Sequence, residues 1–510
     1  MEGRAYLNPK NISASDWENT PESVKRLLVV LLERIEQQEK QLKAQQVEID
    51  WLKEQLRLNS SNSSKPPSSD VGKRKPPKHE KSGKQRGGQP GHEFHFRKLY
   101  PVEACKSVVD YYPTICWNCG AAIAQEEGEV LRHQVVDIPP VEPEVIEYRL
   151  HRCVCLPCDC LTRATLPEQV SRKGYGPGVV ARVGVLRGMY RLSQRMTREA
   201  MSDVFGIELS LGSINNLQLE CSEALEIPVS SAHGYVQQQA VVGADETGFS
   251  QGNVDGHNRE GRKAWLWVAV TPLLTFFMVT LSRSQESAQA LLGKAFSGIL
   301  ITDRHSGYTW VDLIQRQLCW AHLKRDFIRI SERSGASKIL GEALLAQQKN
   351  LFKLWYRVRD GTLSRDEFVV LVQPLRSRVK ELLEEGAAYP IEVKDKSPLA
   401  KTVRTCRRLL KLEPALWVFV ATQGVEPTNN DAERALRPAV IWRRISFGSQ
   451  TEAGSIFVSR MLTVVTTLRS QERNVMEFMT QACYAAREGT APPSLLPIIS
   501  TEADQSVIAA

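Results

Sequence analysis

Two aspartates stand where apolar runs end. Asp245 follows Val-Val-Gly-Ala, and Asp303 follows Ile-Leu-Ile-Thr. A carboxylate in such a place is costly to bury unless it pairs with a base or a metal ion. If the two runs are neighbouring strands, both carboxylates meet at one sheet edge. With a third acid they could then hold two hard cations about 3.5–4 Å apart, as in-line displacement at phosphorus requires. Each aspartate could equally cap the turn after its strand.

The third acid is expected from the segment Thr-Asn-Asn-Asp-Ala-Glu-Arg-Ala-Leu-Arg-Pro, which contains Glu433. Asn430 can cap a helix here, which places Glu433 at the third helical position. Arg434 and Arg437 would project nearby and could contact phosphates. Pro438 predicts that the helix is short or kinked. The alternative interpretation is structural, with Glu433 completing a start that resembles a capping box.

Two C-x-x-C pairs form a second constellation, made of Cys116 with Cys119 and Cys155 with Cys158. Two thiolates on each tight turn can face one ion, and two such turns complete a tetrahedral zinc site. Strand-like runs at 130–136 and 145–150 favour a zinc ribbon. Cys153 and Cys160 flank the second pair and leave the ligand set open. A redox role would need a βαβ pattern, which the sequence does not show here.

The elements that must position the acids follow from residue 239 onward. Strands are expected at 239–247, 264–270 and 275–281, a helix at 284–296, and a fourth strand at 298–302 beside the first. These describe an α/β layer. The chain then turns mostly helical from Trp320 to about Val420, and two more helices follow an Asn-rich turn.

The N-terminal part shows a heptad pattern. Apolar residues recur every seven positions, at Leu28, Ile35, Leu42, Ile49 and Leu56. This spacing fits a short coiled coil, with a single amphipathic helix docked on a domain as the alternative.

A linker rich in Ser, Pro, Gly and Lys follows, and its composition predicts a disordered segment. Between Lys65 and Lys98, ten Lys or Arg stand against three acids, a net charge of +7. Such a segment could bind a polyanion, or it could be only a solvated linker. Its candidate DNA contacts are Lys73, Arg74, Lys75 and Lys78.

Between the cysteines and the strands the pattern is helical. One helix is expected at 193–205, ended by Gly206, and Ser210 is a good N-cap for the next. Two helices around a short turn could be a helix-turn-helix reader of DNA or an ordinary helical hairpin.

The overall composition suits a multidomain globular protein. The chain has 510 residues, 42% of them hydrophobic and 24% charged. At roughly 100–200 residues per domain, three or four domains are expected. Its apolar runs are far shorter than the roughly 20 residues that span a bilayer, and no secretory signal is visible. A membrane protein and a secreted protein are therefore not expected.

Four motifs occur in a fixed order: Asp-Glu-Thr-Gly, Thr-Asp-Arg-His-Ser-Gly-Tyr, Cys-Trp-Ala-His-Leu-Lys-Arg and Asn-Asn-Asp-Ala-Glu-Arg-Ala-Leu-Arg-Pro. In this order, with the Asn-Ser-Ser-Asn-Ser-Ser-Lys-Pro-Pro segment and the paired cysteines, the chain resembles transposases of the bacterial insertion sequence 66 family. The resemblance implies an RNase H-like core interrupted by a helical insertion. It also implies a catalytic triad of two aspartates and a glutamate, on Asp245, Asp303 and Glu433.

The resemblance further implies cleavage and strand transfer of DNA, with two Mg²⁺ (or Mn²⁺) ions at the triad and Zn²⁺ at the cysteines. His322 could orient a phosphate or be a buried structural histidine. Expected partners are element-end and target DNA, a second copy through the coiled coil, and accessory transposition proteins. The expected location is the bacterial cytoplasm, at the nucleoid. The alternatives are an inactive zinc-containing DNA-binding protein and a nuclease without strand transfer.

The expected organisation is multidomain, with seven parts. These are a coiled coil (21–58), a basic linker (59–98), a zinc-binding domain (99–170), a helical DNA-binding domain (178–230), an RNase H-like core (238–325 and 426–450), a helical insertion (326–425) and C-terminal helices (451–490).

Overall fold

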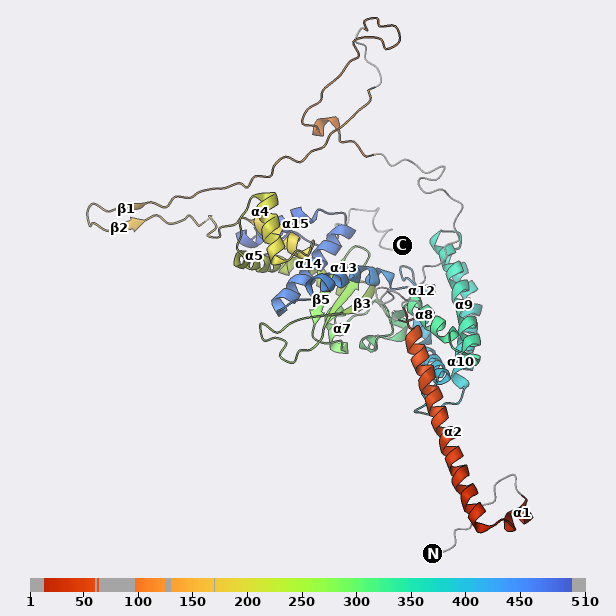
Figure 1. Ribbon diagram of the computed structural model, residues 1–510. Helices are drawn as coiled ribbons and strands as arrows, with labels where there is room; N and C mark the ends of the chain where they lie inside the picture. Colours follow the sequence, from red (N-terminus) through yellow and green to blue (C-terminus); the bar gives the residue numbers. More distant parts are fainter. Residues whose placement is uncertain (1–12, 60–61, 64–96, 124–129, 169, 498–510) are drawn as a thin grey trace.

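The computed structural model describes residues 13–59, 62–63, 97–123, 130–168 and 170–497 (Figure 1). Its centre is a mixed five-stranded sheet with the strand order β5-β4-β3-β6-β7. The strands are β3 (Val241–Phe249), β4 (Ala264–Val270), β5 (Thr275–Thr280), β6 (Ile299–Thr302) and β7 (Arg316–Leu318).

The chain builds this sheet in two steps. Strands β3, β4 and β5 form an antiparallel meander. Helix α7 (Gln285–Leu292) then carries the chain back, and β6 pairs with β3 in parallel, as the sequence predicts. Strand β7 joins β6 in parallel and was not predicted, since three residues are too few to show a periodic pattern. The structure also contains three short 3-10 turns near this part of the sheet. They are η3 (Ser306–Tyr308), η4 (Leu313–Gln315) and η5 (Glu413–Leu416).

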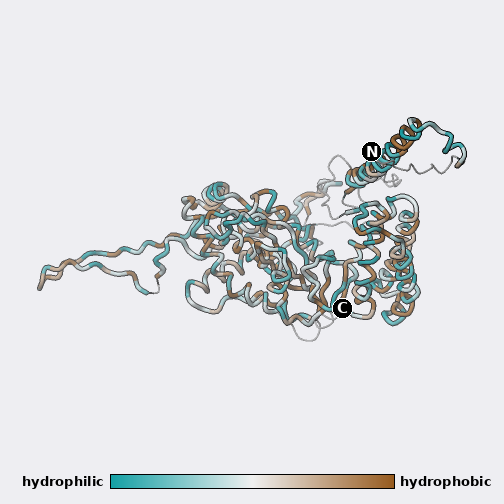
Figure 2. The backbone as a smooth tube through the Cα atoms, turned by 90° about the horizontal axis from the view of Figure 1, so that it is seen from below, coloured by the Kyte–Doolittle hydropathy of each residue, from teal (hydrophilic) through white to brown (hydrophobic). Residues whose placement is uncertain are grey.

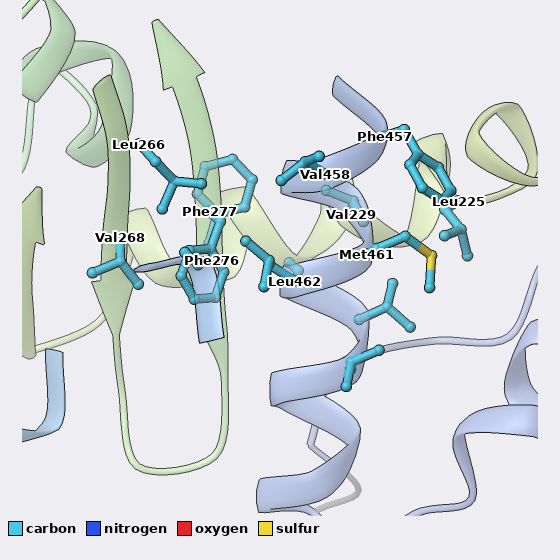
Figure 3. Packing of buried hydrophobic residues seen from close by; sticks show 14 of the residues in the cluster. Leu225, Val229, Leu266, Val268, Phe276, Phe277, Phe457, Val458, Met461 and Leu462 are labelled. Atoms are coloured by element: carbon cyan, nitrogen blue, oxygen red, sulfur yellow. The ribbon is translucent and has the colours of Figure 1, made fainter. Parts of the chain in front are cut away.

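The main core lies between the antiparallel half of the sheet and two helices, α6 (Glu226–Gln237) and α14 (Glu452–Ser470). Figure 3 shows Phe276 and Phe277 of β5 beside Leu462 of α14. The same helix also covers the edge of the sheet: Thr463 Oγ1 accepts the backbone N–H of Phe277 at 2.9 Å. An edge strand whose N–H groups are satisfied in this way is protected from pairing with another chain.

Helices before and after the sheet share this core. They are α3 (Pro177–Gly188), α4 (Gln194–Phe205), α5 (Leu211–Ala224) and α15 (Val475–Glu488). The predicted local signals are confirmed: the Ser193 and Ser210 side chains cap α4 and α5, and Gly206 ends α4 at φ 63°. Helix α5 packs against α3, α14 and α15, so this helical pair is built onto the body that holds the sheet.

A second core forms in the chain segment that follows β7, before the chain returns to the sheet. Five helices surround it: α8 (Trp320–Ser331), α9 (Ala336–Arg359), α10 (Arg365–Ala388), α11 (Pro398–Lys411) and α12 (Val418–Ala421). Leu318 of β7 belongs to the same cluster, so this helical segment is attached rigidly to the sheet. Helix α13 (Asn430–Ser446) then crosses β3 and β4.

The N-terminal residues form α1 (Ala14–Glu18) and the long helix α2 (Glu22–Arg57). The predicted heptad residues lie on one continuous helix, and they are largely exposed: Leu42 keeps 64% of its surface. Helix α2 projects from the body, and only its C-terminal end meets the helical segment (Figure 1).

Residues 97–123 and 130–168, here called the cysteine arm, project on the other side. The prediction of strands at 130–136 and 145–150 is wrong, since neither run pairs with another strand. Regular structure in the described part of the arm is limited to η2 (Val102–Ala104) and a hairpin of β1 (Arg152–Val154) with β2 (Leu161–Arg163). Apolar runs alone do not make a sheet, because each strand needs a partner for its backbone.

Candidate active site

Asp245 and Asp303 lie side by side where β6 ends. Asp303 directly follows β6, as predicted, but Asp245 lies within β3, which continues to Phe249, so the prediction that Asp245 ends its strand was wrong. In the parallel pair, Val241 is level with Ile299 and Gly243 is level with Ile301. Two residues further along each chain lie Asp245 and Asp303, so the register places them side by side. Asp303 Oδ1 also accepts the backbone N–H of His305 at 2.7 Å, which holds the carboxylate at the start of the loop.

The acids influence one another electrostatically. Burial raises the pKa of Asp245 well above its usual range, and the negative charges of Glu246, Asp303 and Glu433 raise it further. Like charges this close destabilise the ionised state of each carboxylate. The three acids predicted from the sequence therefore share one electrostatic site.

Asn429 sets the position of Glu433. Its side-chain nitrogen donates to Ala244 O of β3 at 2.7 Å, and its backbone N–H donates to Cys319 Sγ at 3.2 Å. Gly243 lets the two segments approach, because a Cβ there would lie 2.9 Å from Asn429 Oδ1. The start of α13 is thus fastened to the strand that carries Asp245.

The predicted N-cap of α13 was wrong, and the helix is not short. Asn429, and not Asn430, is the N-cap, and its side chain makes no capping bond because it is bound to β3. The helix also continues through Pro438 to Ser446, since packing of Ala439 and Trp442 in the core supports it. Glu433 lies one position deeper than predicted, and no reciprocal capping box forms.

Glu433 faces helix α8. Arg325 Nη2 donates to Glu433 Oε1 at 3.2 Å, and His322 Nδ1 lies 3.6 Å from the same oxygen. His322 Nδ1 is buried without a hydrogen-bond partner in the structure. Burial, followed by the charge of Arg325, lowers the pKa of His322, which favours the neutral imidazole. Ligand atoms of Cys319, His322 and Glu433 lie within 4.8 Å of one another.

Sequence reasoning missed a buried network on the opposite face of β3. Glu246 follows Asp245, and successive side chains of a strand point to opposite faces. Its carboxylate accepts from Arg283 Nη2 at 2.6 Å and from the Tyr308 hydroxyl at 2.7 Å. The signal was present, since Glu246 belongs to the Asp-Glu-Thr-Gly motif and Tyr308 ends the Thr-Asp-Arg-His-Ser-Gly-Tyr motif.

Arg316 of β7 was also missed. Its guanidinium is buried and donates to Thr302 Oγ1 at 3.1 Å, to Asp303 O at 2.9 Å and to His305 O at 3.1 Å. These bonds fix the backbone on both sides of the Asp303 carboxylate. Together, Glu246 and Arg316 hold the loop that presents Asp303.

The four zinc candidates lie in the cysteine arm on two separate turns. In the first, Cys116 N donates to Ala121 O at 2.8 Å, and Gly120 takes the predicted reversal at φ 71°. In the second, β1 and β2 flank Cys155 and Cys158. The structure does not bring the two turns together: among the described residues, the group close enough to share an ion is that of Cys319, His322 and Glu433.

The DNA-contact candidates divide into two groups. Lys73, Arg74, Lys75 and Lys78 lie outside the described residues. Arg434 and Arg437 are exposed on α13 beside Glu433, and Arg434 forms an ion pair with Asp431. His322 is the candidate that lies directly at the acid site.

The donor set at the acid site fits a hard divalent cation. All three predicted ligands are carboxylates, and Mg²⁺ and Mn²⁺ prefer oxygen donors. Among the described residues, these three carboxylates are not grouped closely enough to share one ion as they stand, and their mutual repulsion contributes to the raised pKa of Asp245. An arrangement of this kind is suited to stabilising charge on a reacting phosphate.

A central mixed sheet surrounded by many helices is consistent with a transposase catalytic core. Residues 173–456 match the transposase IS66 family, and the chain belongs to this family. Residues 17–98 match a family of unknown function, DUF6444. Among the described residues, no helix is both long and apolar enough to cross a membrane.

Two curated relatives come from Sinorhizobium fredii. The uncharacterized protein y4hP is 24% identical over 412 residues, which cover 73% of this chain and 71% of the relative. The uncharacterized protein y4qI is 27% identical over 249 residues, or 44% of each chain, so the similarity spans less than half of its length.

Proposed function

We propose that this protein is a DNA transposase that cuts the ends of an insertion sequence and joins them to target DNA. Membership of the transposase IS66 family supports a transposase role. The observation that supports the chemistry is the placement of Asp245 on β3 and of Asp303 directly after the neighbouring β6, with the start of the helix that carries Glu433 fastened to β3 through Asn429.

In this proposal Asp245, Asp303 and Glu433 would hold two Mg²⁺ or Mn²⁺ ions. When bound, such ions activate a water or a 3′-hydroxyl and stabilise the leaving 3′-oxygen. Arg325 keeps the Glu433 carboxylate in place. The neutral imidazole of His322, with its unpartnered Nδ1, orients a phosphate beside it. Water attacks a phosphodiester at the element end and leaves a 3′-hydroxyl and a 5′-phosphate. That 3′-hydroxyl then attacks a target phosphodiester, which joins element to target and releases a 3′-hydroxyl of the target strand.

The other regions would hold the DNA and the partner copy. We infer that the basic residues Lys73, Arg74, Lys75 and Lys78 bind phosphates, and that the two cysteine turns close around Zn²⁺ and help to recognise element ends. The pair α4–α5 is a second candidate reader. The exposed heptad residues of α2 suit a coiled coil with a second copy. Accessory proteins and a place at the bacterial nucleoid complete the proposal.

The test is cleavage of duplex DNA carrying the element ends by the full chain with Mg²⁺. Asp303→Asn and Glu433→Gln should each lower the cleavage rate by roughly 1000-fold, since several kcal/mol of charge stabilisation are lost. Binding of end DNA should stay within about twofold. Asp431→Asn is the matched control, because this exposed acid lies two residues from Glu433 and should leave cleavage unchanged.

Joined products distinguish the outcomes. Cleavage without joined products would indicate a nuclease, and binding without cleavage by the unaltered chain would indicate an inactive DNA-binding protein. Full activity of Asp303→Asn would remove that residue from the site.

A further inference from the structure

A cationic surface extends from the acid site onto the helical segment. It consists of Arg329 and Arg333 around α8 and of Lys401, Arg404, Arg408 and Lys411 on α11, and we name it the α8–α11 surface. The α11 members recur at intervals of three and four, which places them on one helix face. Lys411 and Arg408 are exposed, and Arg404 is half-buried.

This surface is continuous with the acid site. A cleft of about 530 Å³ is lined both by Asp303 and His322 and by Arg408 and Lys411. A second cleft of about 340 Å³ shares Arg329 and Arg408 with the first and leads on to Arg333 and Lys401. Through their shared residues, the two clefts therefore connect Asp303 with the cations of the α8–α11 surface.

The end of the N-terminal helix lies on this path. Glu54 of α2 pairs with Arg333 Nη2 at 2.8 Å and with Lys401 Nζ. The contact is well enclosed, since 14% of the Glu54 side chain and 7% of the Arg333 side chain remain exposed. Burial alone would raise the pKa of Glu54, but the bonds from Lys401 and Arg333 lower it below the usual value, so the carboxylate is ionised.

The Asn-Ser motif after α2 holds this contact together. Asn62 is buried, its Nδ2 donates to Glu332 Oε2 at 2.6 Å, and its Oδ1 accepts the backbone N–H of Asn59 at 2.8 Å. Glu332 is the C-cap of α8, so the motif fastens the end of α2 to the helix that carries His322 and Arg325. The catalytic triad does not explain why this motif is present. Its contact with Glu332 gives it a role in holding the end of α2 in place.

We propose that the α8–α11 surface binds the backbone of the DNA that enters the acid site, and that Glu54 occupies the Arg333–Lys401 end of it in the free protein. This inference rests on the proposed function, which supplies DNA as the polyanion. Arg and Lys bind carboxylate and phosphate oxygens by the same charge-assisted hydrogen bonds, so a phosphate and Glu54 compete for one place. Release of the end of α2 would therefore accompany DNA binding.

The first experiment measures affinity of the full chain for a labelled duplex by fluorescence anisotropy at several salt concentrations, without added Mg²⁺. Arg408→Gln with Lys411→Gln should weaken binding at least tenfold at low salt. The slope of log affinity against log salt should flatten by about 0.9 for each DNA phosphate that the variant no longer neutralises. The control is Lys349→Gln with Lys353→Gln, a pair of exposed lysines on α9 that line neither cleft.

The second experiment tests the competition. Glu54→Gln should raise DNA affinity severalfold more than Glu39→Gln, which removes the same charge from an exposed position of α2. The inference fails if the Arg408/Lys411 variant binds like the α9 control, if Glu54→Gln matches Glu39→Gln, or if a hairpin RNA of equal charge binds the surface more tightly than duplex DNA.

These readouts are separate from the test of the proposed function. Loss of cleavage in the unaltered chain, with the affinity shifts present, would contradict the transposase chemistry alone. Normal cleavage with no affinity shift would contradict the α8–α11 surface alone.

Discussion

The acid site and the cysteine arm are built in opposite ways. Around the acids, Glu246, Arg316 and Asn429 are buried, and each is hydrogen-bonded to a different strand or loop. In the described part of the arm, large apolar side chains are exposed: Trp117 keeps 95% of its surface and Leu131 keeps 96%. Figure 2 shows the hairpin of the arm extending away from the body, with hydrophobic and hydrophilic stretches along it. The first region is supported by its own core. The second has no such core among its described residues, and in our proposal bound zinc supplies its stability.

Function depends on folding in a different way in each of these two regions. At the sheet edge, the packing that stabilises the fold also fixes the carboxylates. In the described part of the arm, local turns are well defined around each cysteine pair, but no core links them. The predictions below separate the two regions, starting from the largest expected effect.

Zinc removal should affect the arm and spare the sheet. Cys116→Ser with Cys119→Ser removes half of a tetrahedral ligand set, so bound zinc should fall from about one ion per chain to nearly none. Specific binding of end DNA should fall at least tenfold, while the unfolding transition of the sheet should not move. Elemental analysis and thermal unfolding measure the two effects. Cys105→Ser is the control, and equal zinc in all three proteins would contradict the assignment.

Tyr308→Phe should affect the sheet and spare the arm. Burial raises the pKa of Tyr308 well above its usual range, so its hydroxyl stays protonated and donates to Glu246. Removing the hydroxyl leaves a buried carboxylate short of one partner, which should lower the free energy of unfolding by about 1–3 kcal/mol. Denaturant unfolding measures the change.

Tyr484→Phe provides the matched comparison, because Tyr484 is exposed and its change should stay within about 0.5 kcal/mol. Bound zinc should be the same in both tyrosine variants. If the two variants unfold alike, the buried network does not support the sheet edge.

Gly120→Ala should have the smallest effect. Gly120 has a φ of 71° with open space around it, so alanine would meet only backbone strain of about 1–2 kcal/mol. Zinc affinity should fall about tenfold, because the strained turn presents its thiolates less well. Gly174→Ala, also in open space but without a positive φ, should change nothing. Competition with a zinc chelator distinguishes the two variants, and identical affinities would show that this turn does not shape the zinc site.

By itself the sequence determined the local elements and their order. The heptads of α2, the caps at Ser193 and Ser210, and the order of elements from β3 to β6 all follow from short-range patterns. Such patterns involve neighbouring residues, so one chain segment carries the whole signal. The same reasoning failed at 130–150, where apolar runs had no strand to pair with.

Only the tertiary structure decided which of these residues meet. That Asn429 binds β3 instead of capping α13, that Glu246 is buried with Tyr308, and that Glu54 reaches Arg333 all depend on contacts between residues far apart in the chain. No periodic pattern encodes such pairs, because each results from the packing of whole elements. The acids could therefore be named from the sequence, whereas the groups that hold them in place could not.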